Sequence, residues 1–168
     1  MKRFTLDKVA NIVLVVTCLI VGGQAGFKMY RNVVPVRPAP VYRLGEIIKD
    51  TPDLGLRKAR LTLLMITAST CHFCSASMPF YRRLREVAQR AGTRMVAVTP
   101  EDPDTNRTYL DQNGVSVETV VSLTKNSIRV RLTPTLILLK SDGVVVNSWQ
   151  GQLASNLEHD VLSAIGGH

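Results

Sequence analysis

The stretch Leu61 to Cys74, L-T-L-L-M-I-T-A-S-T-C-H-F-C, joins a nearly continuous apolar run to a pair of cysteines. A short run this apolar is typical of a β-strand that is buried on both faces of a sheet. A C-x-x-C pair has three common explanations, which are a redox-active dithiol, half of a metal site and an attachment point for haem. The rest of the sequence discriminates among these three.

The sequence after Cys74 alternates between helical and strand periodicity. The expected helices are Ser75–Ala91, with Gly92 at its end, Thr105–Gln112 and Ser155–Ile165. The expected strands are Met95–Val98 and the two arms of a hairpin, Thr135–Leu139 and Val144–Trp149, while Val117–Leu123 is either a short strand or irregular. This order predicts an α/β fold, in which a central mixed β-sheet is flanked by helices and covered on both sides.

Length and composition are those of one globular domain with a short extension. The chain has 168 residues, of which 45% are hydrophobic and 20% are charged. Its formal net charge is +8, but the basic residues are scattered and only 5% of the residues are aromatic, which argues against nucleic acid as a partner. The densest basic cluster falls on a segment with helical period and contains Arg82, Arg83, Arg85, Arg90 and Arg94. A solvated outer face is the simplest explanation of this cluster, and an anionic partner surface is the alternative.

The N-terminal segment Val9–Phe27 carries no charged residue. It is long enough to span a membrane, with residues 1–8 as a cytoplasmic tail, whereas its most apolar part, Ile12–Val21, also fits a cleaved signal peptide. We expect an uncleaved transmembrane anchor over residues 9–27. With the N-terminus in the cytoplasm, either interpretation places the larger C-terminal part of the chain outside it. Cys18 is expected to be a small apolar residue of this segment.

Residues 28–60 are expected to be a proline-rich linker and lead-in to a domain that covers residues 61–168. The part between Pro35 and Pro40 cannot continue a helix or a central strand, which predicts an extended linker. A short helix is expected over Leu44–Lys49, before the turn sequence T-P-D-L-G. The linker would hold the domain away from the membrane.

The cysteine pair lies where an α/β sheet usually places its chemistry, in a loop that leaves a central strand and opens a helix. At the start of a helix, free backbone N–H groups and the helix dipole favour an anion. The thiolate of Cys71 should therefore be stabilised, and the pKa of its thiol should fall below that of a free cysteine. Cys74 follows one turn later and can reach the first sulfur.

Four features together resemble the thioredoxin superfamily. They are C-H-F-C between a strand and a helix, Pro79 after that pair, Thr133-Pro134-Thr135 before a strand, and Asp142-Gly143 in a hairpin turn. With its N-terminal anchor, the chain is similar to the membrane-tethered, TlpA-type thiol-disulfide oxidoreductases that face the bacterial periplasm. The resemblance covers about Leu61 to Ile165.

The resemblance implies a thioredoxin-like fold in which Cys71 and Cys74 are the catalytic pair. It also implies that Pro134 follows a cis peptide bond and lies against the cysteines, and that Thr133 offers backbone groups to an extended substrate segment. The physics agrees with a proline at this place, because a cis X-Pro bond costs little and proline removes an N–H that would crowd the sulfurs.

The sequence departs from the family pattern at several positions. Met65 stands where thioredoxin carries a buried acid, and Ser77 stands where several TlpA-type reductases have a glutamate. Without either carboxylate, no obvious internal base is present to deprotonate Cys74. Between the cysteines, His72 and Phe73 are expected to modulate the site. A protonated His72 would favour the thiolate and make the oxidised form a better oxidant, unless its side chain points into solvent.

The metal and haem explanations fit the sequence less well than a redox-active dithiol. Covalent haem needs a histidine directly after the second cysteine, where this chain has Ser75. A zinc site needs two further ligands, but there is no second cysteine pair, and His159 and His168 lie in and beyond the last expected helix. A copper-carrying thiol protein stays open. A peroxiredoxin is disfavoured because Ala68 stands where that family has a threonine. We expect no metal and no cofactor.

These observations predict a membrane-tethered thiol-disulfide oxidoreductase. It would cross the bacterial inner membrane once, through residues 9–27, and expose its domain to the periplasm. Its partners would be protein thiols and disulfides and a membrane or periplasmic redox protein, with no nucleic acid. The alternative is a non-catalytic, thioredoxin-like binding or assembly module whose cysteines form a structural disulfide, which export would permit.

Overall fold

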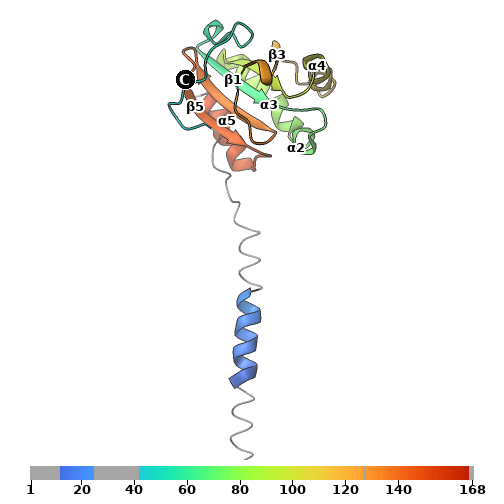
Figure 1. Ribbon diagram of the computed structural model, residues 1–168, viewed down its shortest axis with the longest axis vertical. Helices are drawn as coiled ribbons and strands as arrows, with labels where there is room; N and C mark the ends of the chain where they lie inside the picture. Colours follow the sequence, from blue (N-terminus) through green and yellow to red (C-terminus); the bar gives the residue numbers. More distant parts are fainter. Residues whose placement is uncertain (1–11, 25–41, 127, 167–168) are drawn as a thin grey trace, which may run out of the picture. The chain divides into compact units, whose positions relative to one another are not determined.

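The computed structural model describes residues 12–24, 42–126 and 128–166 (Figure 1). The chain divides into two compact units, Met1–Pro38 and Ala39–His168. In the first unit, residues 12–24 form a helix with exposed side chains. Among the helices of the described residues, none is both long enough and apolar enough to cross a membrane. The remainder of the expected anchor and the proline-rich segment up to Pro40 lie outside the described residues.

Five strands of the second unit form one mixed sheet in the order β3-β2-β1-β4-β5 (Figure 1). The strands are β1, Leu61–Ile66, β2, Arg94–Thr99, β3, Thr119–Ser122, β4, Thr135–Lys140, and β5, Val145–Gln150. β1 pairs with β2 in parallel and with β4 in antiparallel orientation, β3 is parallel to β2, and β5 is antiparallel to β4. The predicted mixed sheet and its hairpin are confirmed, and the segment that the sequence left open contains a strand.

The helices of the second unit are α2, His72–Ala76, α3, Met78–Ala91, α4, Pro103–Gln112, and α5, Ser155–Gly166. The single helix expected after the cysteines is wrong, because α2 and α3 are separate helices that meet at Ser77. Pro79 explains the break: it has no N–H to donate to the carbonyl of Ser75, whereas the first turn of a new helix tolerates proline. The predicted end of α3 at Gly92 is confirmed, since Gly92 caps the helix in the left-handed conformation.

Alternating side chains of β1 enter two hydrophobic cores, one on each face of the sheet. Leu63 and Met65 pack in the first core, which takes the buried side chains of α3, α4 and α5. Leu64 and Ile66 pack in the second core, which is completed by apolar residues from the lead-in to β1 and by Ile128. The strand is fully buried, as its apolar run predicts.

The lead-in to β1 packs on the sheet, but not as expected. The helix predicted over Leu44–Lys49 is wrong: this segment turns at Gly45 and then runs beside the hairpin, with a bridge between Ile47 and Val144. Its backbone is satisfied by the hairpin rather than by a helix, because Gly45 N–H donates to Val145 O (2.9 Å) and Ile48 N–H to Gly143 O (2.9 Å). Tyr42, Ile48, Leu54 and Leu56 are buried in the second core.

The register of the sheet brings three chain segments to one edge. Ile66, the last residue of β1, pairs with Thr135, the first residue of β4. β2 runs parallel to β1 and ends at Thr99, near the same edge. The loop to the cysteines, the turn after β2 and the residues before β4 therefore emerge close together, as expected of strand ends in an α/β sheet.

Candidate functional site

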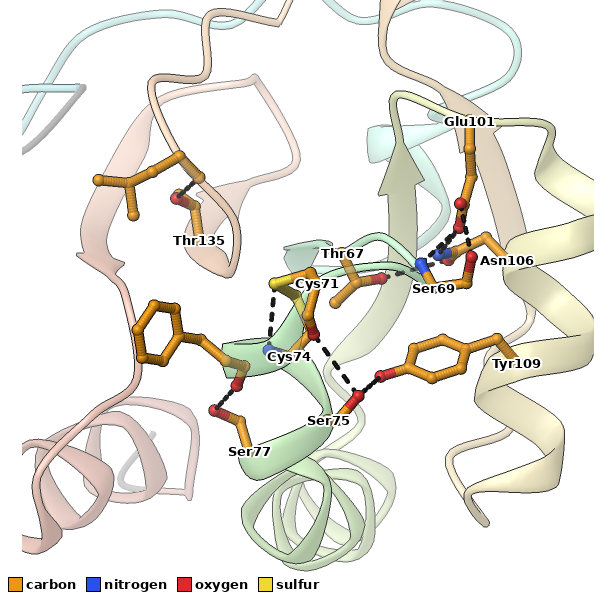
Figure 2. The surroundings of a disulfide bond; sticks show 12 residues. Thr67, Ser69, Cys71, Cys74, Ser75, Ser77, Glu101, Asn106, Tyr109 and Thr135 are labelled. Carbon is orange, nitrogen blue, oxygen red and sulfur yellow. Dashed lines mark hydrogen bonds between the residues drawn. A yellow bond between two sulfur atoms is a disulfide. The ribbon is translucent and has the colours of Figure 1, made fainter.

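The two cysteines form a disulfide at the start of α2 (Figure 2). Cys71 is the N-cap residue and Cys74 follows one turn later, with 5.2 Å between their Cα atoms. Cys74 is fully buried, whereas Cys71 is partly exposed. The backbone N–H of Cys74 points at Cys71 Sγ, 3.1 Å away. The outer sulfur is thus open to a partner, and an N–H donor is already in place for negative charge on it.

A cis peptide bond joins Thr133 to Pro134, which confirms that part of the prediction. Pro134 is buried and Thr133 is partly exposed. Strand pairing fixes their position, since the next residue, Thr135, lies beside Ile66, from which the chain runs directly to Cys71. The hydroxyl of Thr135 donates to Leu132 O (2.8 Å), and Pro134 O accepts from Gly151 N–H (2.7 Å). The structure therefore brings the cis-proline loop and the cysteine loop to the same edge of the sheet.

The two residues between the cysteines face outward on α2. His72 and Phe73 are exposed, and their rings meet edge to face with centroids 5.7 Å apart. Phe73 is 55% exposed, whereas most large apolar residues of this unit are buried. Both side chains are available to whatever approaches the disulfide.

The two positions that depart from the family pattern are both buried. Met65 is fully buried in the middle of the sheet. Ser77, between α2 and α3, donates its hydroxyl to Phe73 O (2.8 Å). Nearby Tyr81 is buried, and this burial raises the pKa of its phenol above the usual range, so Tyr81 stays neutral. Neither position supplies a charged group to the inner cysteine.

Sequence reasoning missed a carboxylate on the other side of the cysteine loop. Glu101 lies in the turn after β2, and Figure 2 shows its carboxylate above Ser69, two residues before Cys71. It accepts hydrogen bonds from Ser69 N–H (2.7 Å), from the Ser69 hydroxyl (2.7 Å) and from Asn106 Nδ2 (2.9 Å). The signal for this residue is the parallel pairing of β1 and β2, which places the turn after β2 at the same sheet edge as the cysteines.

Asn106 and Tyr109 extend this contact along α4. Asn106 is fully buried, and its Oδ1 accepts from the hydroxyl of Thr67 at 3.2 Å. One turn further on, Tyr109 Oη lies 2.9 Å from the hydroxyl of Ser75, which itself donates to Cys71 O at 3.5 Å. The helix thus touches the chain both before and after Cys71 (Figure 2).

The charge state of Glu101 follows from its partners. Burial alone would raise the pKa of this carboxyl, but the hydrogen bonds from Asn106 and Ser69 outweigh burial and hold the pKa below its usual range. Glu101 is therefore ionised at neutral pH. Within the described ranges, no group of three or more His, Cys, Asp or Glu side chains is gathered that could hold a metal ion.

Comparison with known proteins shows which solved structures have a similar fold. No family model matches the chain, and no curated protein matches its sequence. Solved structures do match: a candidate protein disulfide isomerase from Bacteroides thetaiotaomicron has a TM-score of 0.60 and 17% identity, over 74% of this chain and 89% of that one. A candidate thiol:disulfide interchange protein, DsbE, from Chlorobium tepidum has a TM-score of 0.56 and 22% identity, over 74% of this chain and 99% of that one.

Peroxiredoxin Q from Xanthomonas campestris is also similar, with a TM-score of 0.51 and 15% identity over 66% of this chain and 80% of that one. At these identities the likeness shows the fold alone. The prediction of a thioredoxin-like α/β fold with a mixed sheet flanked by helices is confirmed, and its C-x-x-C pair is at disulfide distance.

Proposed function

We propose that this chain is an exported, membrane-tethered oxidoreductase that exchanges its Cys71–Cys74 disulfide with protein substrates. One observation carries the proposal: the disulfide joins a partly exposed sulfur to a fully buried one, at the sheet edge that also holds the cis Thr133–Pro134 bond. A disulfide that only stabilises the fold has no need of an accessible cysteine. One that exchanges with a partner needs a sulfur that the partner can reach.

In the proposed reaction, the reduced protein attacks a substrate disulfide with the thiolate of Cys71. A new S–S bond joins Cys71 to one substrate sulfur, and the other substrate sulfur leaves as a thiolate that takes up a proton. Cys74 then gives up its proton and attacks Cys71 Sγ. The mixed disulfide breaks, the substrate leaves as a dithiol, and the protein leaves oxidised. The reverse sequence of steps oxidises a substrate dithiol.

The surrounding residues have distinct roles in this proposal. Backbone groups at Thr133 and Pro134 would hold an extended segment of the partner chain beside Cys71. The exposed rings of His72 and Phe73 would contact the same partner and change the stability of the Cys71 thiolate. The buried position of Cys74 keeps the second sulfur from solvent, so that it reacts with Cys71 rather than with a second partner.

The proposed place of action rests on the sequence. The charge-free segment Val9–Phe27 and the proline-rich linker that follows would fix the domain to the bacterial inner membrane on the periplasmic side. Membrane or periplasmic redox proteins would then recycle the cysteines. Fractionation of cells that produce the full chain, with protease added to the outer face of the membrane, tests this part of the proposal.

The exchange reaction is tested with cysteine variants of the full-length chain. Cys18→Ala serves as the background, since Cys18 is a free, exposed thiol that would confuse the readout. In this background we expect Cys71→Ser to abolish reduction of a disulfide substrate such as insulin. Cys74→Ser should instead accumulate a mixed disulfide that dithiothreitol releases. Full exchange activity in the Cys71→Ser variant would remove the proposal.

A further inference from the structure

The segment from β1 to Cys71 is fixed on one side by a single carboxylate. Glu101 accepts two of its three hydrogen bonds from one residue, Ser69, through both the backbone N–H and the hydroxyl. Ser69 is separated from Cys71 by only Thr70, which is exposed. On the other side of Cys71, the Ser75 hydroxyl donates to Cys71 O at 3.5 Å. Glu101 therefore fixes the part of the loop that precedes Cys71, through Ser69.

The carboxylate of Glu101 is itself held in place by a hydrogen bond from Asn106. Asn106 is fully buried in α4 and donates to the carboxylate, while its own oxygen accepts from Thr67 at the end of β1. Thr67, Asn106, Glu101 and Ser69 thus form a chain of hydrogen bonds that begins and ends on the cysteine loop (Figure 2). We refer to these four residues as the loop anchor. Thr67 and Asn106 are buried, whereas Glu101 and Ser69 are partly exposed. A hydrogen-bonded chain whose members are all paired favours one arrangement, since bonds are lost if a member moves.

We propose that Glu101 is a positioning residue for the nucleophile, which keeps Cys71 Sγ at the backbone N–H of Cys74. In the disulfide form that N–H is already 3.1 Å from Cys71 Sγ. After reduction, the same donor would stabilise the Cys71 thiolate, provided that the loop keeps its place. Glu101 acts through Ser69 and donates or accepts no proton in the exchange reaction, so it is not a catalytic residue. The inference deepens the proposed function, on which it rests.

The chemistry of the anchor predicts which substitution preserves it. The carboxylate receives three N–H or O–H donors. A glutamine at this position keeps one oxygen for Ser69 N–H and Asn106 Nδ2, while its amide group donates to the Ser69 hydroxyl, which can accept as well as donate. Glu101→Gln therefore removes the charge but keeps the geometry. Glu101→Ala removes both the charge and the acceptor oxygens, so that Ser69 loses its two hydrogen bonds to this side chain.

The test measures the thiol pKa of Cys71 in the reduced, full-length chain in a Cys18→Ala background. The rate of alkylation by iodoacetamide is followed against pH, with the modified residue identified by mass spectrometry. We expect Glu101→Ala to lower the thiolate-to-thiol ratio of Cys71 about tenfold at neutral pH, because the thiolate loses a charge-assisted hydrogen bond. Glu101→Gln should stay within about threefold of the parent. Glu86→Ala, at an exposed glutamate of α3, is the matched control and should change nothing.

Two outcomes would overturn the inference. An unchanged Cys71 pKa in a folded Glu101→Ala variant would mean that the loop keeps its place without the carboxylate. A thiolate that becomes more stable in both Glu101→Ala and Glu101→Gln would mean that the glutamate acts by its charge. If Glu101→Ala does not fold, Ser69→Ala decides, because it loses the hydroxyl bond alone; we expect a shift in the same direction of about threefold, and an unchanged pKa refutes the inference.

This experiment separates the inference from the proposed function. The thiol pKa is measured without any protein substrate, so it reports on the anchor even if the domain exchanges no disulfide with a partner. If the parent protein exchanges no disulfide although its Cys71 alkylates as a thiolate, only the proposed function is refuted. A normal exchange reaction with an unchanged pKa in Glu101→Ala would remove the inference only.

Discussion

Replacement of Asn106 by leucine is expected to destabilise the oxidised protein by about 2 kcal/mol. Asn106 is fully buried, and leucine has nearly its size but no polar atom. The fully buried hydroxyl of Thr67 would lose its side-chain acceptor, which costs roughly 1–3 kcal/mol. Glu101 would lose one of three donors, worth about 1 kcal/mol because the carboxylate is partly solvated and keeps Ser69. Burial of the apolar leucine offsets part of this sum.

The assay is urea unfolding of the oxidised chain, followed by the fluorescence of Trp149. Trp149 is the sole tryptophan of the sequence and is buried in the first core. In thermal unfolding followed by the same fluorescence, the midpoint should fall by roughly 8 °C, at about 4 °C per kcal/mol for a domain of this size. The slope of the free energy of unfolding against urea should stay the same, since the surface exposed on unfolding hardly changes.

A double-mutant cycle isolates the buried pair. Thr67→Val alone leaves the Asn106 oxygen without its partner, whereas Thr67→Val with Asn106→Leu removes both polar groups together. The double variant should therefore be more stable than the sum of the single effects predicts, by about 1 kcal/mol or more. Thr62→Val, in β1, is the matched control and should not couple to Asn106→Leu. Additivity of Thr67→Val and Asn106→Leu within about 0.5 kcal/mol would refute the reasoning.

Three further predictions concern stability. Thr62→Val should itself stabilise the protein by about 1 kcal/mol in urea unfolding, because the buried hydroxyl of Thr62 has no hydrogen-bond partner among the described residues; a loss of stability would contradict this. Gly143→Ala should cost at least about 1–3 kcal/mol in the same assay, since Gly143 has φ +86° and a Cβ there would collide with Ile48 O; a neutral effect would mean that the lead-in moves freely. Glu101 has a lowered pKa, so its contribution to stability is complete above the unfolded pKa of about 4.3 and is lost as the pH falls through the folded value. Glu101→Gln should therefore flatten the loss of stability below about pH 5, and an unchanged acid limb would argue against it.

The strands and the last two helices followed from local sequence. β1 and the Met95–Val98 part of β2 are nearly continuous apolar runs because both faces of each strand are buried, and such runs are visible without any knowledge of the fold. The hairpin of β4 and β5 carries its turn sequence between two apolar segments, and α5 places Val161 and Ile165 on one helical face. In each case the burial pattern repeats with the period of the element.

The errors arose where a distant partner decided the structure. Residues 44–49 have the composition of a short helix, yet their backbone groups find partners in the hairpin turn around Gly143, nearly a hundred positions later. The break at Ser77 was a local error instead. The sequence predicts one helix over Ser75–Ala91, but the missing N–H of Pro79 and the hydrogen bonds of Ser77 to the preceding carbonyls end α2 there.

The candidate site divides in the same way. The cysteine pair and Thr133-Pro134 are motifs, so their spacing and order led directly to them. Glu101 belongs to no motif, and its meaning comes only from the parallel pairing of β1 and β2, which places the turn after β2 beside Ser69. The loop anchor could be predicted only after the strand order was known.

The measurement that tests the central claim most directly is the reduction potential of the Cys71–Cys74 pair in the full-length Cys18→Ala chain. Equilibration with glutathione or dithiothreitol, followed by trapping of free thiols, gives its value. The proposed function predicts a potential between about −270 mV, typical of a reductase, and about −120 mV, typical of an oxidant. A value below about −300 mV would contradict it, because the disulfide would then be an inert structural bond and the domain a non-catalytic module.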